Sequence, residues 1–115
     1  MLTIEGLSFG RMRIAGRDYR HDLKIVSGEV VADWWRSHGH MISAEDVRDI
    51  LDAQPEALVI GSGLSSQMRV DPELAALLLR SGVQLTVLET AEAVEAYNEL
   101  VERGVNVAGA FHLTC

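Results

Sequence analysis

The feature that most constrains the fold is a set of three short, largely apolar runs in the second half of the chain. They cover residues 57–60, 83–88 and 105–113, and segments with helical spacing of apolar residues separate them. Such runs are typical of strands that are covered on both faces. Because strand–helix–strand units with short connections form right-handed crossovers, this order predicts a parallel sheet. We therefore predict an α/β fold with a C-terminal βαβαβ parallel sheet and helices packed on it.

Three helices are predicted from the residues at their ends. Ser, Asp and Thr side chains can accept hydrogen bonds from the free amide groups of a first turn, and glycine readily adopts the left-handed conformation that ends a helix. Proline stops a helix or occupies its first position. The predicted helices begin at Ser43, at Asp71-Pro72 and at Thr90, and they end at Pro55, Gly82 and Gly104.

The first 42 residues have a different pattern, with apolar and polar residues in alternation. The strands predicted here run from Arg11 to Ile14, from Tyr19 to Val26 and from Val30 to Trp35, with turns at Ala15-Gly16 and Ser27-Gly28. This pattern predicts an N-terminal β-meander joined to the parallel sheet. Two packing arrangements stay open, because the meander can extend the sheet or fold across one of its faces.

Length and charge limit the class of protein. A chain of 115 residues with 48% hydrophobic residues is expected to form a single α/β domain over residues 1–115. A net charge of −7 disfavours binding to nucleic acid or to anionic membranes. The longest apolar run, residues 74–79, is far shorter than the about 18 residues of a membrane span, and the N-terminus lacks the pattern of a secretory signal. We therefore expect a soluble cytoplasmic protein.

The carboxyl ends of the predicted parallel strands define a candidate ligand site, because ligands of such sheets gather there. The residues at these ends are Gly61, Ser62, Gly63, Thr90, Thr114 and Cys115. The glycines match neither a dinucleotide-binding fingerprint nor a P-loop, and the next helix begins with the acids Asp71 and Glu73, which would repel a phosphate. A purely structural glycine turn is the alternative interpretation.

The histidines and the single cysteine suggest neither a catalytic nor a metal site. His112 and Cys115 are three residues apart, so in an extended strand their side chains should diverge. His21, His38 or His40 could still approach Cys115 through the fold, but no triad spacing supports this. His38 and His40 could face one side of an extended segment, but no further ligand stands at a convincing spacing. His21 shares a face with apolar residues and is expected to be a buried, hydrogen-bonded histidine. From these patterns we expect no catalytic residue, no metal site and no cofactor.

Basic and aromatic residues gather in the N-terminal region. Five of the ten basic residues lie within the first 24 residues, where only three of the seventeen acids lie. Arginine and tryptophan are enriched at the energetic centres of protein–protein interfaces. The candidate partner-binding residues are therefore Arg11, Arg13, Trp34, Trp35 and Arg36. The alternative is a solvated hairpin face with one core tryptophan, since Trp34 and Trp35 must point to opposite faces.

An ordered set of short stretches resembles one family of small proteins with an Mth-type domain. This family includes a mitochondrial respiratory complex I assembly factor and the adipogenesis-associated protein. The stretches are Phe9-Gly10, Tyr19-Arg20-His21-Asp22, residues 35–40 (Trp-Arg-Ser-His-Gly-His), residues 58–63, Thr90-Ala91-Glu92-Ala93, Tyr97-Asn98 and His112-Leu113-Thr114-Cys115. The family pattern more often has Thr where this chain has Ser62, and the hydroxyl group is kept.

The resemblance implies a single α/β domain and an assembly or adaptor role, and it brings no catalytic residue or cofactor with it. Our leading hypothesis is a non-enzymatic protein-interaction module that assists assembly of a respiratory or membrane-associated complex. A small-molecule binder or enzyme with its site at the ends of the parallel strands is the alternative, and homo-oligomerisation is a third use of an exposed aromatic. Nine arginines to one lysine suggest a GC-rich bacterial genome.

Overall fold

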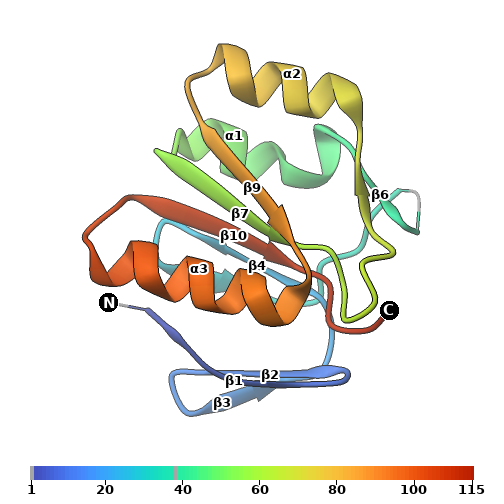
Figure 1. Cartoon of the computed structure of the whole chain (residues 1–115), viewed down its shortest axis with the longest axis vertical. Helices are drawn as coiled ribbons and strands as arrows, with labels where there is room; N and C mark the ends of the chain where they lie inside the picture. Colours follow the sequence, from blue (N-terminus) through green and yellow to red (C-terminus); the bar gives the residue numbers. More distant parts are fainter. Residues whose placement is uncertain (1, 38) are drawn as a thin grey trace.

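A five-stranded mixed sheet forms the centre of the computed structural model, which describes residues 2–37 and 39–115 (Figure 1). The strand order is β5–β4–β10–β7–β9. In this sheet β10, β7 and β9 are parallel, whereas β4 is antiparallel to β10 and β5 is antiparallel to β4. The strands are β4 (Leu23–Val26), β5 (Glu29–Val31), β7 (Ala57–Gly61), β9 (Gln84–Leu88) and β10 (Val107–Phe111). The predicted α/β fold with a C-terminal parallel sheet is confirmed.

Helices cover both faces of this sheet, which explains why β7 and β10 are apolar throughout. In Figure 1, α1 (Arg48–Ala53) and α2 (Pro72–Arg80) lie toward the top, and α3 (Thr90–Glu102) lies below them. In β7, Ala57 and Val59 join the core beside α3, whereas Leu58 and Ile60 join the core beside α1 and α2. Alternate residues therefore supply two separate cores, and every position in β7 and β10 is buried.

The predicted N-terminal antiparallel strands are confirmed, and the structure divides them between two sheets. Strands β1 (Ile4–Ser8), β2 (Arg11–Ile14) and β3 (Arg17–Tyr19) form a separate antiparallel sheet. The β4–β5 hairpin instead extends the main sheet at β10. One arrangement left open by the sequence, extension of the sheet, therefore occurs at β4 and β5, whereas β1–β3 contribute Ile4, Met12 and Ile14 to the core that contains Phe111.

Two of the predicted N-terminal strands are wrong in their extent. The strand predicted from Tyr19 to Val26 is interrupted between β3 and β4, where the carboxylate of Asp22 accepts a hydrogen bond from the backbone amide of Leu113. The strand predicted from Val30 to Trp35 ends at Val31, because the chain then turns through Asp33, which has a φ of +53°. Trp34 consequently enters the core while Trp35 faces solvent.

Helix α3 fixes the small N-terminal sheet in place. The side-chain amide of Asn98 accepts a hydrogen bond from the backbone N–H of Ile4 and donates one to its carbonyl oxygen, both at 2.8 Å. This amide pairs with the edge of β1 as a neighbouring strand would. The Tyr97 hydroxyl also donates to the Leu2 carbonyl oxygen, at 3.3 Å. The Tyr97-Asn98 pair therefore joins the two sheets through one helix.

The predicted helix starts are confirmed in one case and corrected in two. The Asp71 carboxylate accepts a hydrogen bond from the Glu73 amide and caps α2, as predicted. A 3-10 turn, η1 (Glu45–Val47), precedes α1, so Ser43 does not cap it; the Asp46 carboxylate instead accepts hydrogen bonds from the Ser43 amide and hydroxyl. Thr90 is the first residue of α3 rather than its cap, because its hydroxyl is bonded elsewhere.

Candidate functional site

The carboxyl ends of β7, β9 and β10 meet at one rim, and the structure brings the sequence-predicted site residues together there. The Gly63 amide donates to the Thr90 hydroxyl oxygen at 2.9 Å, and this hydroxyl donates to the His112 carbonyl oxygen at 2.7 Å. The Ser62 hydroxyl donates to the carbonyl oxygen of Leu88 at 3.1 Å. The hydroxyl groups of the rim therefore bind the chain itself, and the role of this turn in holding a ligand stays a prediction.

The C-terminal segment, residues 112–115, packs directly on the glycine turn. Gly63 has a φ of +108°, and a Cβ atom there would lie 2.5 Å from the Cys115 carbonyl oxygen and 2.8 Å from Cδ2 of His112. The Leu64 amide donates to the carbonyl oxygen of Thr114 at 2.6 Å, and the Gln67 amide donates to that of Cys115 at 3.0 Å. The glycine at position 63 therefore lets the end of the chain approach.

Behind this rim lies a buried cluster of charged side chains centred on Asp22. One carboxylate oxygen, Oδ2, accepts from His112 Nδ1 at 2.7 Å and from Arg36 Nη2 at 2.8 Å. The other oxygen, Oδ1, accepts from the Leu113 amide at 2.8 Å. The side chains of Asp22, Arg36 and His112 are all at most 11% exposed. Three segments that are far apart in the sequence are joined at this carboxylate.

The surroundings of Asp22 hold its carboxylate in the charged form. Burial by itself raises the pKa of this group, but hydrogen bonds from His112 and Leu113 and the positive charges of His112 and Arg36 oppose the effect. The net result is a pKa below the ordinary value of 3.8. Because an ionised carboxylate carries no proton, the proton of the 2.7 Å contact belongs to Nδ1 of His112. The other ring nitrogen, Nε2, is directed away from Asp22, and it carries a lone pair when the ring is neutral.

Arg36 connects this cluster to Trp34. Its guanidinium carbon lies 4.8 Å from the centroid of the Trp34 ring, within the range of a cation–π contact. Its Nε donates to the Gly39 carbonyl oxygen at 3.2 Å. Within residues 2–37 and 39–115, the buried Nη1 atom of Arg36 has no hydrogen-bond partner. The two N–H donors of this nitrogen are thus unused among the described residues, whereas Nε and Nη2 each donate a bond.

His40 and Cys115 complete the rim, and this corrects the expectation that His112 and Cys115 diverge. Strand β10 ends at Phe111, so the alternation of a strand does not apply to the residues that follow. Cys115 Sγ lies 3.9 Å from His40 Nε2, and the rings of His40 and His112 are 5.7 Å apart in an edge-to-face arrangement. One ligand atom from each of His40, His112 and Cys115 lies within 4.8 Å of the other two.

Other expectations for the histidines are changed as well. His21 is exposed rather than buried, and it lies against the exposed Trp35 ring at a centroid distance of 5.4 Å. His112 is the buried, hydrogen-bonded histidine. His38 lies outside the described residues. The sequence pattern did not distinguish His112, because the strand predicted over residues 105–113 includes it.

The candidate partner-binding residues are separated by the fold. Arg11 and Arg13 are exposed on β2, where both pair with Asp18, at 3.7 and 3.2 Å. Trp34 is buried, and its indole N–H donates to the Asp46 carbonyl oxygen. The Arg36 side chain is 8% exposed. Of the tryptophan and arginine side chains at positions 34–36, only Trp35 faces solvent, with 70% of its surface exposed.

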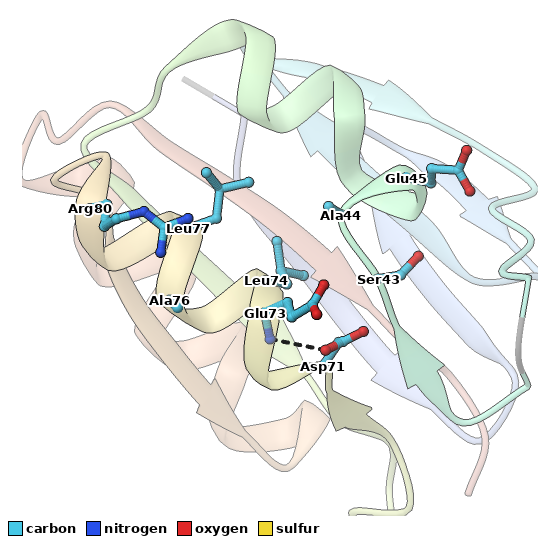
Figure 2. Close-up of a pocket in the computed structure, with 9 residues that line it drawn as sticks. All are labelled: Ser43, Ala44, Glu45, Asp71, Glu73, Leu74, Ala76, Leu77 and Arg80. Carbon is cyan, nitrogen blue, oxygen red and sulfur yellow. Dashed lines mark hydrogen bonds between the residues drawn. The ribbon is translucent and has the colours of Figure 1, made fainter.

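The larger cavities of the described chain lie elsewhere. A groove lies between η1 and α2, and Figure 2 shows the side chains that line it. Its volume is about 450 Å³. It is lined by Ser43, Ala44, Glu45, Asp71, Glu73, Leu74, Ala76, Leu77 and Arg80. The one hydrogen bond among these residues in the view joins Asp71 to the Glu73 amide and belongs to the cap of α2. We call this feature the α2 groove.

Fold and rim together define a class of small α/β proteins that has antiparallel N-terminal strands, a mixed sheet and three helices packed on it. A family model for a protein of unknown function (DUF498/DUF598) matches residues 4–112. The chain belongs to this family, and its resemblance to small proteins with an Mth-type domain is confirmed.

Several solved structures share this fold over nearly the whole chain. The protein MT938 is 27% identical, with all of both chains covered and a TM-score of 0.83. A conserved hypothetical protein from Pyrococcus horikoshii is 24% identical, with 98% of this chain and 99% of that chain covered and a TM-score of 0.86. A Bordetella pertussis protein with an Mth938-like domain is 20% identical, with 97% and 85% covered and a TM-score of 0.77.

No helix in the described part of the chain has the length and apolar character needed to cross a membrane.

Proposed function

We propose that the chain is a non-enzymatic protein-interaction module that acts in the cytoplasm and helps to assemble a respiratory or membrane-associated complex. The observation that carries this proposal is Trp35, a large aromatic side chain that is exposed although both of its neighbours, Trp34 and Arg36, are buried and bonded. Tryptophan is among the residues that contribute most to binding at protein interfaces.

The backbone under Trp35 is held rigidly, which favours binding. Trp34 donates its backbone N–H to the Asp22 carbonyl oxygen at 2.8 Å, and Arg36 is paired with the carboxylate of the same aspartate. Binding to an ordered side chain loses less conformational entropy than binding to a mobile one. Trp35 and His21, which lies against it, therefore form a preformed aromatic contact, and we call them the Trp35 surface.

A second exposed aromatic is attached to the same part of the fold. Phe9 is 69% exposed, on the turn between β1 and β2. The next residue, Gly10, donates its amide to the Leu113 carbonyl oxygen at 2.8 Å, and Leu113 in turn donates to Asp22. The backbone next to Phe9 and the backbone next to Trp35 are thus linked through Leu113 and Asp22, and a protein partner that contacts both rings would bury two large apolar side chains.

The test is recovery of partners from the native host with the full chain as bait. We expect Trp35→Ala to reduce recovery of the specific partner by about tenfold or more, because interface tryptophans commonly contribute above 2 kcal/mol. The unfolding temperature should change little, since Trp35 is exposed. Light scattering of both proteins shows whether the partner is a second copy of the chain.

The matched control is Leu79→Ala, which removes another exposed apolar side chain, on α2. This variant should recover the partner as the wild type does. Equal recovery by wild type and Trp35→Ala would contradict the proposal, and so would equal losses in the Trp35 and Leu79 variants.

A further inference from the structure

We propose that His40, His112 and Cys115 bind a single Zn²⁺ ion at the rim of the sheet. The Nε2 atom of His40 lies 3.9 Å from Cys115 Sγ, and one ligand atom of each residue lies within 4.8 Å of the other two. Two imidazole nitrogens and one thiolate sulfur are donors that zinc accepts, and zinc sites with three protein ligands are common.

The distances are close to those a bound ion requires. Zinc–nitrogen bonds of about 2.0 Å and zinc–sulfur bonds of about 2.3 Å place tetrahedral ligand atoms about 3.5 Å apart. The separation of 3.9 Å between His40 Nε2 and Cys115 Sγ is therefore only slightly too long. Both side chains are exposed and can adjust by rotation about their side-chain bonds, whereas His112 is buried and stays in place.

The buried ligand is already oriented for metal binding. Nδ1 of His112 donates to the Asp22 carboxylate at 2.7 Å, which leaves the Nε2 lone pair directed away from Asp22. Most metal-binding histidines use one ring nitrogen for the metal and donate the other N–H to a carboxylate or carbonyl group in this way. The Thr114 hydroxyl lies 3.4 Å from His112 Nε2, a long contact whose loss on metal binding costs little. Asp22 is therefore a positioning residue for the site.

The backbones of all three ligands are fixed by one segment, residues 61–69. The His112 amide donates to the Gly61 carbonyl oxygen at 3.0 Å. The carbonyl oxygens of Cys115 and His40 accept from the amides of Gln67 and Arg69, at 3.0 and 2.8 Å. Little backbone ordering is left for the ion to impose, and such preorganisation favours binding.

The electrostatics of the cluster also suit a divalent ion. The positive charge of Arg36 is balanced by Asp22, with which it forms a 2.8 Å ion pair. A Cys115 thiolate would offset half of the charge of Zn²⁺. Because His40 and Cys115 face solvent, the fourth coordination position is open to water or to a further ligand. This donor set distinguishes the rim from a purely structural zinc site, in which all four ligands come from the protein.

The experiment is a titration of Zn²⁺ into the chelator-treated full chain, kept reduced with a phosphine, followed by calorimetry. A parallel titration with Co²⁺ reports sulfur coordination through a thiolate-to-cobalt charge-transfer absorption band. We expect a single ion per chain and a clear thiolate band. Cys115→Ser should remove the band, and His40→Ala should weaken zinc binding by about tenfold or more. Asp22→Asn should weaken it by about 10- to 100-fold, as expected for the loss of a carboxylate partner of a ligand.

His21→Ala is the matched control, because it removes a histidine that is exposed but outside the cluster. It should bind zinc as the wild type does. Since His40 and Cys115 are exposed, their variants should keep the circular dichroism of the folded chain. The proposal is overturned if the wild type binds no zinc, if the cobalt spectrum lacks the thiolate band, or if Cys115→Ser and His40→Ala bind zinc as tightly as the wild type.

Discussion

The rim of the sheet and the α2 groove differ in how their polar side chains are used. The α2 groove has a volume of about 450 Å³; its Glu45, Glu73 and Arg80 side chains are exposed, and Asp71 caps its own helix (Figure 2). Behind the rim, by contrast, the buried side chains of Arg36 and His112 both bond to the carboxylate of Asp22. Convergence of buried polar groups is costly unless they are satisfied, so it is a stronger indication of a functional site than empty volume is.

The largest effect on stability should come from a substitution at Gly63, where the C-terminal segment, residues 112–115, packs on the glycine turn. We expect Gly63→Ala to lower the free energy of unfolding by about 3 kcal/mol, because the new methyl group meets the Cys115 backbone and Gly63 has a positive φ. Urea unfolding followed by circular dichroism measures this loss. Gly82→Ala, at the end of α2, is the control: Gly82 also has a positive φ, of +75°, but a Cβ there meets nothing, so about 1 kcal/mol is expected. Equal losses would show that close packing of the tail contributes nothing.

Removing the negative charge of Asp22, in the cluster behind the rim, should have the next largest effect on stability. Asp22→Asn leaves Arg36 buried without its counter-ion, so we expect a loss of about 2 kcal/mol in the same unfolding measurement. The same substitution in the groove, Asp71→Asn, should change stability by less than about 0.5 kcal/mol, since asparagine caps helices as well as aspartate does. If the two variants lost the same free energy of unfolding, the buried Asp22 network would stabilise the fold no more than the Asp71 helix cap does.

The smallest expected effect is on the pH dependence of stability. The pKa of Asp22 is lower in the folded chain than its ordinary value of 3.8, so the unfolded chain binds protons more readily. The stabilisation from Asp22 is therefore complete above about pH 3.8 and is lost as the pH falls through the lower folded value. Asp46 contributes in the same direction: burial raises its pKa, but hydrogen bonds from Ser43 and Ser37 outweigh that effect and lower it.

Acid unfolding of the wild type and Asp22→Asn would test this pH dependence. We expect a shallower loss of stability at low pH in the variant, and Asp71→Asn should keep the slope of the wild type. Parallel acid curves for wild type and Asp22→Asn would mean that Asp22 titrates equally in the folded and unfolded chain.

The sequence predicted the C-terminal half of the fold well because its signals are local. Apolar runs marked β7, β9 and β10, and the Asp71-Pro72 pair marked the start of α2. The N-terminal strands were harder to delimit, since Asp22 interrupts the second predicted strand through bonds to residues about ninety positions away. No local pattern carries information about such bonds.

The candidate site was predicted in part for the same reason. Parallel topology alone brings Gly61, Ser62, Gly63, Thr90, Thr114 and Cys115 to one rim, and the structure places them there. The approach of His40 to Cys115 follows from pairing between β6 (Met41–Ile42) and β8 (Arg69–Val70), two strands of only two residues each. Strands that short have no recognisable periodicity, so this part of the rim could not be found from spacing.

Two backbone hydrogen bonds hold the main chain next to the exposed aromatic side chains of Phe9 and Trp35. The residue after Phe9 donates its amide to Leu113, and the residue before Trp35 donates its amide to Asp22. Every amino acid except proline can supply such a donor, whatever its side chain. The main chain beside each ring is therefore held in place whatever the neighbouring side chains are, and substitutions in the surrounding surface can change what the rings meet without moving the backbone that carries them.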